Sequence, residues 1–229
     1  MFVAKNYNDL TILSQQNGGN YGLDSYHTEE EYEKSVADIF YTWGWSDSKG
    51  SNTRYLLIRE FPITNNLNNN DVLLVLTNHP KHIYQIQFMP SAGNTQNMID
   101  QTIEFVSRVH SFCNLTIRPY HYDYGQDFIG QIKGRVTGSY QIDERRTNVY
   151  KQLSKYGLIV CNYLGTTWLE TMSSNKPTVC FFDEDIISFR EQAKPYIHEL
   201  KQVGILHDNP VSAAKHIKKI SPNVNLWWK

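Results

Sequence analysis

The turn Leu164-Gly165-Thr166-Thr167 has residue types that can bind phosphate. Gly165 lets the backbone come close to a ligand. The helix expected to follow it offers free N–H groups and the positive end of its dipole. Thr166 or Thr167 could instead simply cap that helix. The motif is shorter and less specific than a dinucleotide fingerprint, so the turn alone leaves both interpretations open.

Other polar side chains could contribute to binding or proton transfer. Arg118 carries a fork of N–H donors suited to phosphate, and the alternative is a surface ion pair with Asp123 or Glu144. His121 could act as a base or donate to phosphate, although most of the eight histidines are expected to have no such role. His79 stands beside Pro80 in another candidate loop.

A glycine-rich segment, Gln15 to Gly22, reads QQNGGNYG. Its glycines allow the backbone to approach a ligand, and an ordinary surface turn is the alternative. Gly18 and Gly19 are therefore candidate binding positions, and Asn17 lies directly before them.

The phosphate-type turn lies inside a compact strand–helix–strand pattern. Leu158–Cys161 and Thr178–Phe182 are short apolar runs typical of buried strands. Thr166–Asn175, between them, contains good helix formers and neither glycine nor proline. So short a unit predicts a βαβ motif, whose two strands are parallel.

The rest of the chain alternates in the same way. Strands are predicted at Leu10–Ser14, Tyr55–Ile58, Val72–Leu76, Leu115–Ile117, Tyr140–Ile142 and Ile205–His207, with a weakly alternating segment at Ile83–Phe88. Helices are predicted from Thr28 to about Phe40, and at Thr95–Phe112, Phe128–Lys133, Val149–Tyr156, Ile187–Val203 and Pro210–Ile220. This pattern predicts an α/β, Rossmann-like fold: an open, mostly parallel sheet with helices on both faces.

Ligands of such sheets bind beyond the carboxyl ends of the strands. Four polar loops are expected at that edge: Asn17–Gly22, Asn78–Pro80, Arg118–Asp123 and Gly165–Thr167. Their coincidence is stronger evidence for a binding site than any one of them.

Composition narrows the class of protein. The chain has 229 residues, 40% of them hydrophobic and 20% charged, with a formal net charge of −1, so it is globular and does not suggest a nucleic-acid partner. Its three cysteines show no metal-ligand spacing and fit a reducing cytoplasm. The sequence shows neither a signal-peptide pattern at its start nor an apolar stretch long enough for a transmembrane segment. We therefore expect no metal, and a location in the cytoplasm or at the inner face of its membrane.

Several segments together resemble a family of bacterial transferases that make surface polysaccharide. They are GGNYG at 18–22, YTWGWSD at 41–47, RPYHYDYG at 118–125 and YLGTTWLETMSSNKPTVCFFD at 163–183. The resemblance continues through FREQAKPYIHELKQVGILHDNPVSAAKHI and the final LWW, so it covers nearly the whole chain. It implies that residues 1–229 form a single Rossmann-like domain, the C-terminal half of a two-domain protein. The chain is also distantly similar to CDP-glycerol glycerophosphotransferases and other GT-B glycosyltransferases.

The resemblance also assigns roles. In GT-B enzymes two Rossmann-like domains face each other across a cleft, and the C-terminal one holds the donor nucleotide. Gly165, Thr166 and Thr167 would then hold the donor phosphates, with Gly18, Gly19 and Arg118 beside them. Glu170 would accept hydrogen bonds from the ribose, and a solvated helix position is its alternative role. Arg190 and Glu191 match a family position and are interpreted as structural or cleft-rim residues.

One position departs from the family pattern. Asn17 stands where the family has a histidine that is a plausible general base, and asparagine cannot take up a proton at neutral pH. Either the base lies elsewhere, with His121 and His79 as candidates, or another domain supplies it, or the protein is impaired as a catalyst. His79-Pro80 is also similar to the His-Pro pair of CMP-sugar-dependent sialyltransferases, but two residues do not identify the nucleotide.

The sequence thus predicts the donor-binding domain of a GT-B transferase. Its donor would be a nucleotide-activated sugar or polyol phosphate, which is a substrate and not a cofactor. Its other partners would be a carbohydrate acceptor and an N-terminal GT-B half. Two alternatives remain: an enzyme like the nucleotide-sugar 2-epimerases, which share the fold and phosphate site, and a non-catalytic Rossmann-like interaction domain.

Overall fold

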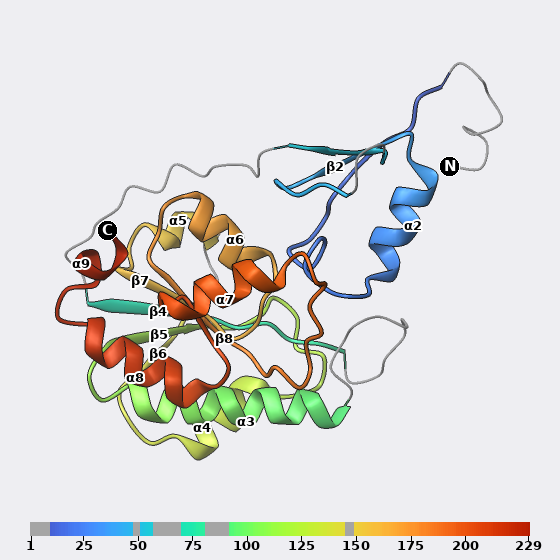
Figure 1. Ribbon diagram of the computed structural model, residues 1–229. Helices are drawn as coiled ribbons and strands as arrows, with labels where there is room; N and C mark the ends of the chain where they lie inside the picture. Colours follow the sequence, from blue (N-terminus) through green and yellow to red (C-terminus); the bar gives the residue numbers. More distant parts are fainter. Residues whose placement is uncertain (1–9, 48–50, 57–69, 81–91, 145–148) are drawn as a thin grey trace.

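The computed structural model describes residues 10–47, 51–56, 70–80, 92–144 and 149–229 (Figure 1). Its larger part is a six-stranded sheet in which every neighbouring pair is parallel. The strand order is β6-β5-β4-β7-β8-β9. The strands are β4 (Asp71–Val75), β5 (Asn114–Arg118), β6 (Gln141–Ile142), β7 (Leu158–Cys161), β8 (Thr178–Phe181) and β9 (Leu206–His207). The predicted α/β fold with a Rossmann-like, open parallel sheet is confirmed.

Helices cover both faces of this sheet (Figure 1). One face packs against α3 (Ala92–Val109), α4 (Phe128–Arg135) and α8 (Pro210–Ile220), and the other against α5 (Val149–Leu153), α6 (Thr166–Ser173) and α7 (Lys194–Gln202). A short helix, α9 (Val224–Trp228), ends the chain. Side chains alternate along a strand. Val72 and Leu74 of β4 therefore enter one core, and Leu73 between them enters the other. Burial on both sides explains why these strands are continuous apolar runs.

The first strands form a separate sheet and do not extend the large one. β1 (Leu13–Gln15), β2 (Ile39–Thr42) and β3 (Thr53–Tyr55) are parallel in the order β1-β2-β3. With α2 (Thr28–Val36) they make a small unit at one end of the molecule (Figure 1). Its core contains Tyr21, Ala37 and Phe40. The strands predicted at Leu10–Ser14 and Tyr55–Ile58 therefore correspond to the small sheet, and those predicted from Val72 onward to the large one.

The predicted helix from Thr28 to Phe40 is too long. It ends at Val36, Ala37 is extended, and Ile39–Thr42 is a strand. A β-branched and aromatic run favours a strand, and the pairing partners of β2 lie on two other segments of the chain. Thr28-x-x-Glu31 has the pattern of a capping box, but the helix is capped by His27, whose Nδ1 accepts from the Glu30 N–H at 3.2 Å.

The predicted helix over Ile187–Val203 is also too long, because α7 begins only at Lys194. The preceding segment bonds to the small unit instead: Phe189 forms a bridge with Asp24, and the Arg190 N–H donates to the Leu23 carbonyl at 3.0 Å. The predicted strand at Tyr55–Ile58 corresponds to β3, with its last residues outside the described part of the chain. Ile83–Phe88 also lies outside the described residues.

Arg190 connects the small unit to the large unit, which is the six-stranded sheet with its covering helices. Its Nη2 lies 3.0 Å from both carboxylate oxygens of Glu30, whose side chain is fully buried. Its Nε donates to the Asp24 carbonyl at 3.2 Å, and its guanidinium lies 5.2 Å from the ring centre of Trp45. The Glu30 carboxylate also accepts from the Gly22 N–H at 2.7 Å. Arg190 therefore has the structural role expected for it.

Candidate donor-binding site

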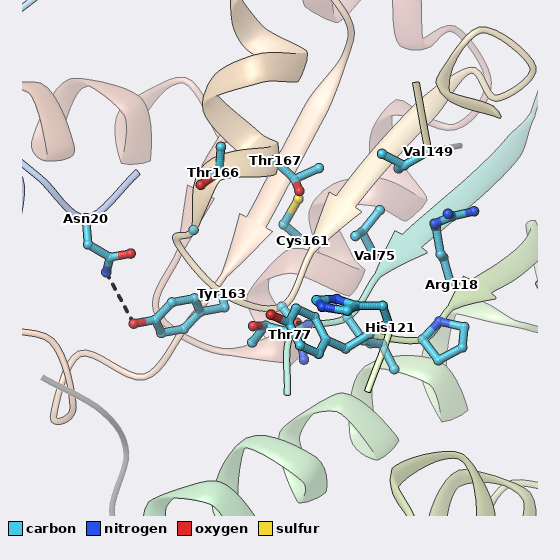
Figure 2. Close-up of a pocket in the computed structure, with 15 residues that line it drawn as sticks. Asn20, Val75, Thr77, Arg118, His121, Val149, Cys161, Tyr163, Thr166 and Thr167 are labelled. Atoms are coloured by element: carbon cyan, nitrogen blue, oxygen red, sulfur yellow. Dashed lines mark hydrogen bonds between the residues drawn. The ribbon is translucent and has the colours of Figure 1, made fainter. Parts of the chain in front are cut away.

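A cavity of about 400 Å³ opens beyond the carboxyl ends of β4, β5 and β7 (Figure 2). Its walls come from the ends of these three strands, the start of α6, the start of α5 and the loop after β1. The lining residues are Asn20, Val75, Leu76, Thr77, Arg118, Pro119, Tyr120, His121, Val149, Cys161, Asn162, Tyr163, Gly165, Thr166 and Thr167. Three of the four predicted polar loops contribute side chains, and the fourth, Asn78–Pro80, follows directly after Thr77. The cavity lies where ligands of open parallel sheets bind.

The first turn of α6 faces this cavity without a side-chain cap. Gly165 is the N-cap residue, and no side chain of the described residues bonds to the free N–H groups there. Thr166 and Thr167 are therefore not caps, and both line the cavity. The hydroxyl of Thr166 accepts from the Gly19 N–H at 3.3 Å. The N–H groups and the dipole of α6 remain available for an anion.

Gly18 and Gly19 support the cavity and do not line it. A Cβ on Gly19 would lie 2.1 Å from the Gly165 carbonyl oxygen, so glycine is needed for the two backbones to touch. Gln16 holds the loop in place: its Oε1 accepts from the Trp43 N–H at 2.9 Å and from the Trp45 indole at 2.8 Å. The glycine loop thus serves a backbone contact with the α6 turn.

Arg118 lines the cavity and is ion-paired, although with neither of the expected partners. It contacts Asp143, and both side chains are largely buried. Asp143 also accepts from Gln152 at 3.1 Å. This carboxylate offsets the guanidinium charge. Anion binding would therefore depend more on the α6 N–H groups than on a net positive charge.

Glu170 lies one turn further along α6 and outside the cavity lining. Tyr150 of α5 donates its hydroxyl proton to Glu170 Oε1 at 2.7 Å. Burial raises the pKa of this carboxyl group, and the Tyr150 hydrogen bond opposes that shift. Glu170 is therefore a half-buried, oriented acceptor and not a freely solvated side chain.

The three candidate catalytic residues, His121, His79 and Asn17, differ in their position relative to the cavity. His121 is exposed and lines the cavity. His79 is buried, its ring packs edge-on against Tyr163 at 5.3 Å between centres, and burial lowers its pKa to about 4. Asn17 is exposed and does not line the cavity. Of the three, only His121 lies at the cavity wall.

Asn20, Tyr163 and Asn162 are among the polar cavity residues that the sequence did not single out individually. Asn162 accepts from the Thr77 N–H at 2.8 Å and donates to the Thr102 hydroxyl at 3.2 Å, so it fixes the end of β4 relative to β7. Asn20 donates to the Tyr163 hydroxyl at 3.2 Å (Figure 2). Two of them could have been found from the sequence, since Asn20 and Tyr163 lie in GGNYG and YLGTT, two segments that carry the family resemblance.

Within the described residues, no cluster of three or more histidine, cysteine or carboxylate side chains could hold a metal ion. In that same part of the chain, no helix combines the length and apolar character needed to cross a membrane.

The cavity offers an uncapped helix start, hydroxyls, an amide and an aromatic wall, which together suit a ligand that carries phosphate and hydroxyl groups.

No curated protein matches this sequence. The sequence model described as LIC12162 family transferase matches residues 1–229, the entire chain. The chain therefore belongs to the LIC12162 family of transferases.

Proposed function

We propose that this chain is the donor-binding domain of a GT-B transferase that takes part in the synthesis of bacterial surface polysaccharide. Its donor is a nucleotide-activated sugar or polyol phosphate. The observation that carries the proposal is the uncapped start of α6, which opens into a cavity at the carboxyl ends of the strands. Membership of a transferase family supports it independently.

The walls suggest how such a donor lies. The phosphates bind at Gly165–Thr167, where backbone N–H groups and two hydroxyls converge. The nucleoside lies towards Val149 at the cavity wall, and its ribose hydroxyls reach beyond the lining to the Glu170 carboxylate. The transferred group then extends towards the small unit, where Asn20 and Tyr163 form the wall.

Transfer also needs a bound acceptor and a base near its hydroxyl. His121 is the only one of the three candidates at the cavity wall, and Asn17 cannot serve as a base. We propose that a facing N-terminal GT-B half supplies the acceptor surface, and that the complete protein works in the cytoplasm at the inner face of the membrane. The isolated chain would bind nucleotide and transfer no sugar.

Calorimetric titration of the 229-residue chain with UDP, CDP and GDP tests this function. Thr167→Ala removes one hydroxyl from the phosphate site and should weaken the best nucleotide by about 1–2 kcal/mol, roughly five- to thirtyfold. Ser107→Ala removes an exposed hydroxyl of α3 and should change nothing. Equal affinity in the Thr167 and Ser107 variants would contradict the proposed phosphate site.

The alternative activities give different results in the same samples. Epimerisation of a UDP-sugar without an acceptor would select the epimerase-like enzyme. Robust transfer by the chain alone would place the base and acceptor site within it, with His121 the first residue to replace. Failure of all three nucleotides to bind would favour the interaction domain.

A further inference from the structure

The side-chain amide of Asn20 is held in one orientation at the wall of the cavity. Its Nδ2 donates to Asp24 Oδ2 at 3.1 Å and to the Tyr163 hydroxyl at 3.2 Å. An amide nitrogen has two protons, so these two bonds use both of them. The backbone of Asn20 is fixed as well, because its carbonyl accepts from the Leu23 and Asp24 N–H groups, each at 3.1 Å.

Asp24 determines whether the nitrogen or the oxygen of the Asn20 side-chain amide faces the cavity. A carboxylate oxygen only accepts, so the neighbouring group of Asn20 must be its nitrogen. Asp24 is fully buried, and Arg190 and Glu30 are the charged groups that act on it. The Arg190 side chain also bonds to the Asp24 carbonyl, which fixes this residue to the large unit.

The remaining atom of the amide is its oxygen. Figure 2 shows the side-chain carbonyl of Asn20 directed towards the space between Thr166 and Tyr163. Among the described residues none donates a hydrogen bond to it. Asn20 is partly exposed, so water can reach this oxygen before a ligand binds. A ligand that displaces this water favours the site only if it brings a donor, because an acceptor that loses water without a new partner costs free energy.

We propose that Asn20 Oδ1 binds a hydroxyl of the group that is transferred, and that Asp24 and Tyr163 are positioning residues for this contact. The inference rests on the proposed function, because the phosphate site at Gly165–Thr167 places that group beside Asn20. The matching substrate class is a sugar or polyol phosphate with a free hydroxyl close to its phosphate.

Small phosphates test this contact without any choice of nucleotide. NMR titrations of the 229-residue chain compare methyl phosphate, which has no hydroxyl, with glycerol 1-phosphate and glucose 1-phosphate. At least one hydroxylated probe should bind about three- to tenfold more tightly than methyl phosphate, the effect of one hydrogen bond. Asn20→Ala should remove this preference and leave the affinity for methyl phosphate unchanged.

Asp24→Asn tests the positioning role separately. Asparagine at this site has the same shape and can donate, so the Asn20 amide is free to turn its nitrogen towards the cavity. The preference for hydroxylated probes should therefore fall, with methyl phosphate again unaffected. Glu31→Gln removes an exposed carboxylate from the same unit and should keep the full preference.

The pH profile of this preference distinguishes positioning from simple structural support. Burial raises the pKa of Asp24 to about 7, while the Asn20 hydrogen bond and Arg190 lower it and Glu30 raises it; Tyr163 also faces this carboxylate. Protonated Asp24 can donate and no longer fixes the amide. The preference should decline from pH 8 to pH 6 in the wild type and stay low throughout in Asp24→Asn.

The outcomes separate the two proposals. If UDP, CDP or GDP binds at Gly165–Thr167 but the hydroxyl preference is absent, or survives Asn20→Ala, the Asn20 inference is wrong and the proposed function stands. If no nucleotide binds but glycerol or glucose 1-phosphate shows an Asn20-dependent preference, the inference stands and nucleotide binding is wrong. Absence of both effects overturns both.

Discussion

Glu170 offers a direct test of where the proposed nucleotide places its nucleoside. Its carboxylate is oriented by Tyr150 and lies one turn beyond the phosphate-type turn. Glu170→Gln keeps the shape but removes the charge, and hydrogen bonds to charged acceptors are stronger than neutral ones. The preference for UDP over 2′-deoxy-UDP should drop by about three- to tenfold in calorimetry. Glu104→Gln, on the exposed side of α3, serves as the control, and an unchanged preference in Glu170→Gln would exclude ribose contact.

Individual site residues differed in how far the sequence could predict them. The α6 turn was identifiable because all its residues are adjacent, so local rules for strand ends and helix starts apply. The orientation of the Asn20 side chain was not, because it depends on a hydrogen bond to Tyr163, which is far away in the chain. For Arg118 the sequence suggested an ion pair as the alternative, but it could not show that the partner is Asp143, which directly follows the neighbouring strand β6.

At the scale of elements, the contact between the glycine loop and α6 should be sensitive to a single methyl group. Gly19→Ala places a Cβ 2.1 Å from the Gly165 carbonyl, so the loop or the helix start must move. We expect a loss of about 1–3 kcal/mol in unfolding free energy by urea denaturation. Gly134→Ala in α4 meets open space and should be neutral or stabilising by up to about 1 kcal/mol. Equal stability of the two variants would show that the contact does not constrain the loop.

The ion pair between Arg190 and Glu30 joins the two units, and removing only its cation should cost more stability than removing both charges. Arg190→Met leaves the fully buried Glu30 without its guanidinium, which should cost about 3–5 kcal/mol of unfolding free energy. Adding Glu30→Gln to that variant removes the uncompensated charge and should recover part of the loss. A double-mutant cycle by urea denaturation measures this coupling. Additive effects of the two substitutions would mean that Arg190 stabilises the fold through its other contacts, with the Asp24 carbonyl and the Trp45 ring, and not through Glu30.

Elements defined by local patterns were predicted well, and those defined by distant contacts were not. The unit from β7 through α6 to β8 follows from two apolar runs and a helix-forming segment. The end of α2 and the start of α7 were misplaced, because Ile39–Thr42 and Ile187–Ala193 take their conformation from remote partners. Tertiary contacts of this kind override local helix and strand propensity.

At the scale of the whole molecule, buried His79 should make stability depend on pH. Its pKa falls from about 6.5 to about 4 on folding, so between these values the unfolded chain binds the proton more readily. Stability should therefore fall as pH drops through this window, by up to about 3 kcal/mol. His79→Gln should lose less stability than the wild type between pH 7 and pH 4 in urea denaturation. Identical pH profiles would show that His79 is not held neutral.

Asp24 contributes in the opposite direction. Its pKa is raised to about 7, so the folded chain binds the proton more readily from about pH 4 to pH 7, and this term favours folding as pH falls. The comparison between wild type and His79→Gln cancels this contribution, because Asp24 is present in both proteins.

The arrangement of two sheets could not be read from the sequence. Alternating elements predict parallel strands, but they do not show where one sheet ends and another begins. The break lies between β3 and β4. Arg190, in the segment before α7, binds Glu30 of the small unit, and Gly19 of the small unit contacts the α6 turn. The cavity therefore combines Asn20 of the small unit with residues of the large one.

The most direct test of the account is an amide NMR titration of the 229-residue chain with UDP, CDP and GDP. The account predicts that one of these nucleotides shifts the amide resonances of Gly165, Thr166 and Thr167 by more than any others, because its phosphates bind at the start of α6. Shifts confined to the amino ends of the strands, around Cys113 and Gly157, would contradict it.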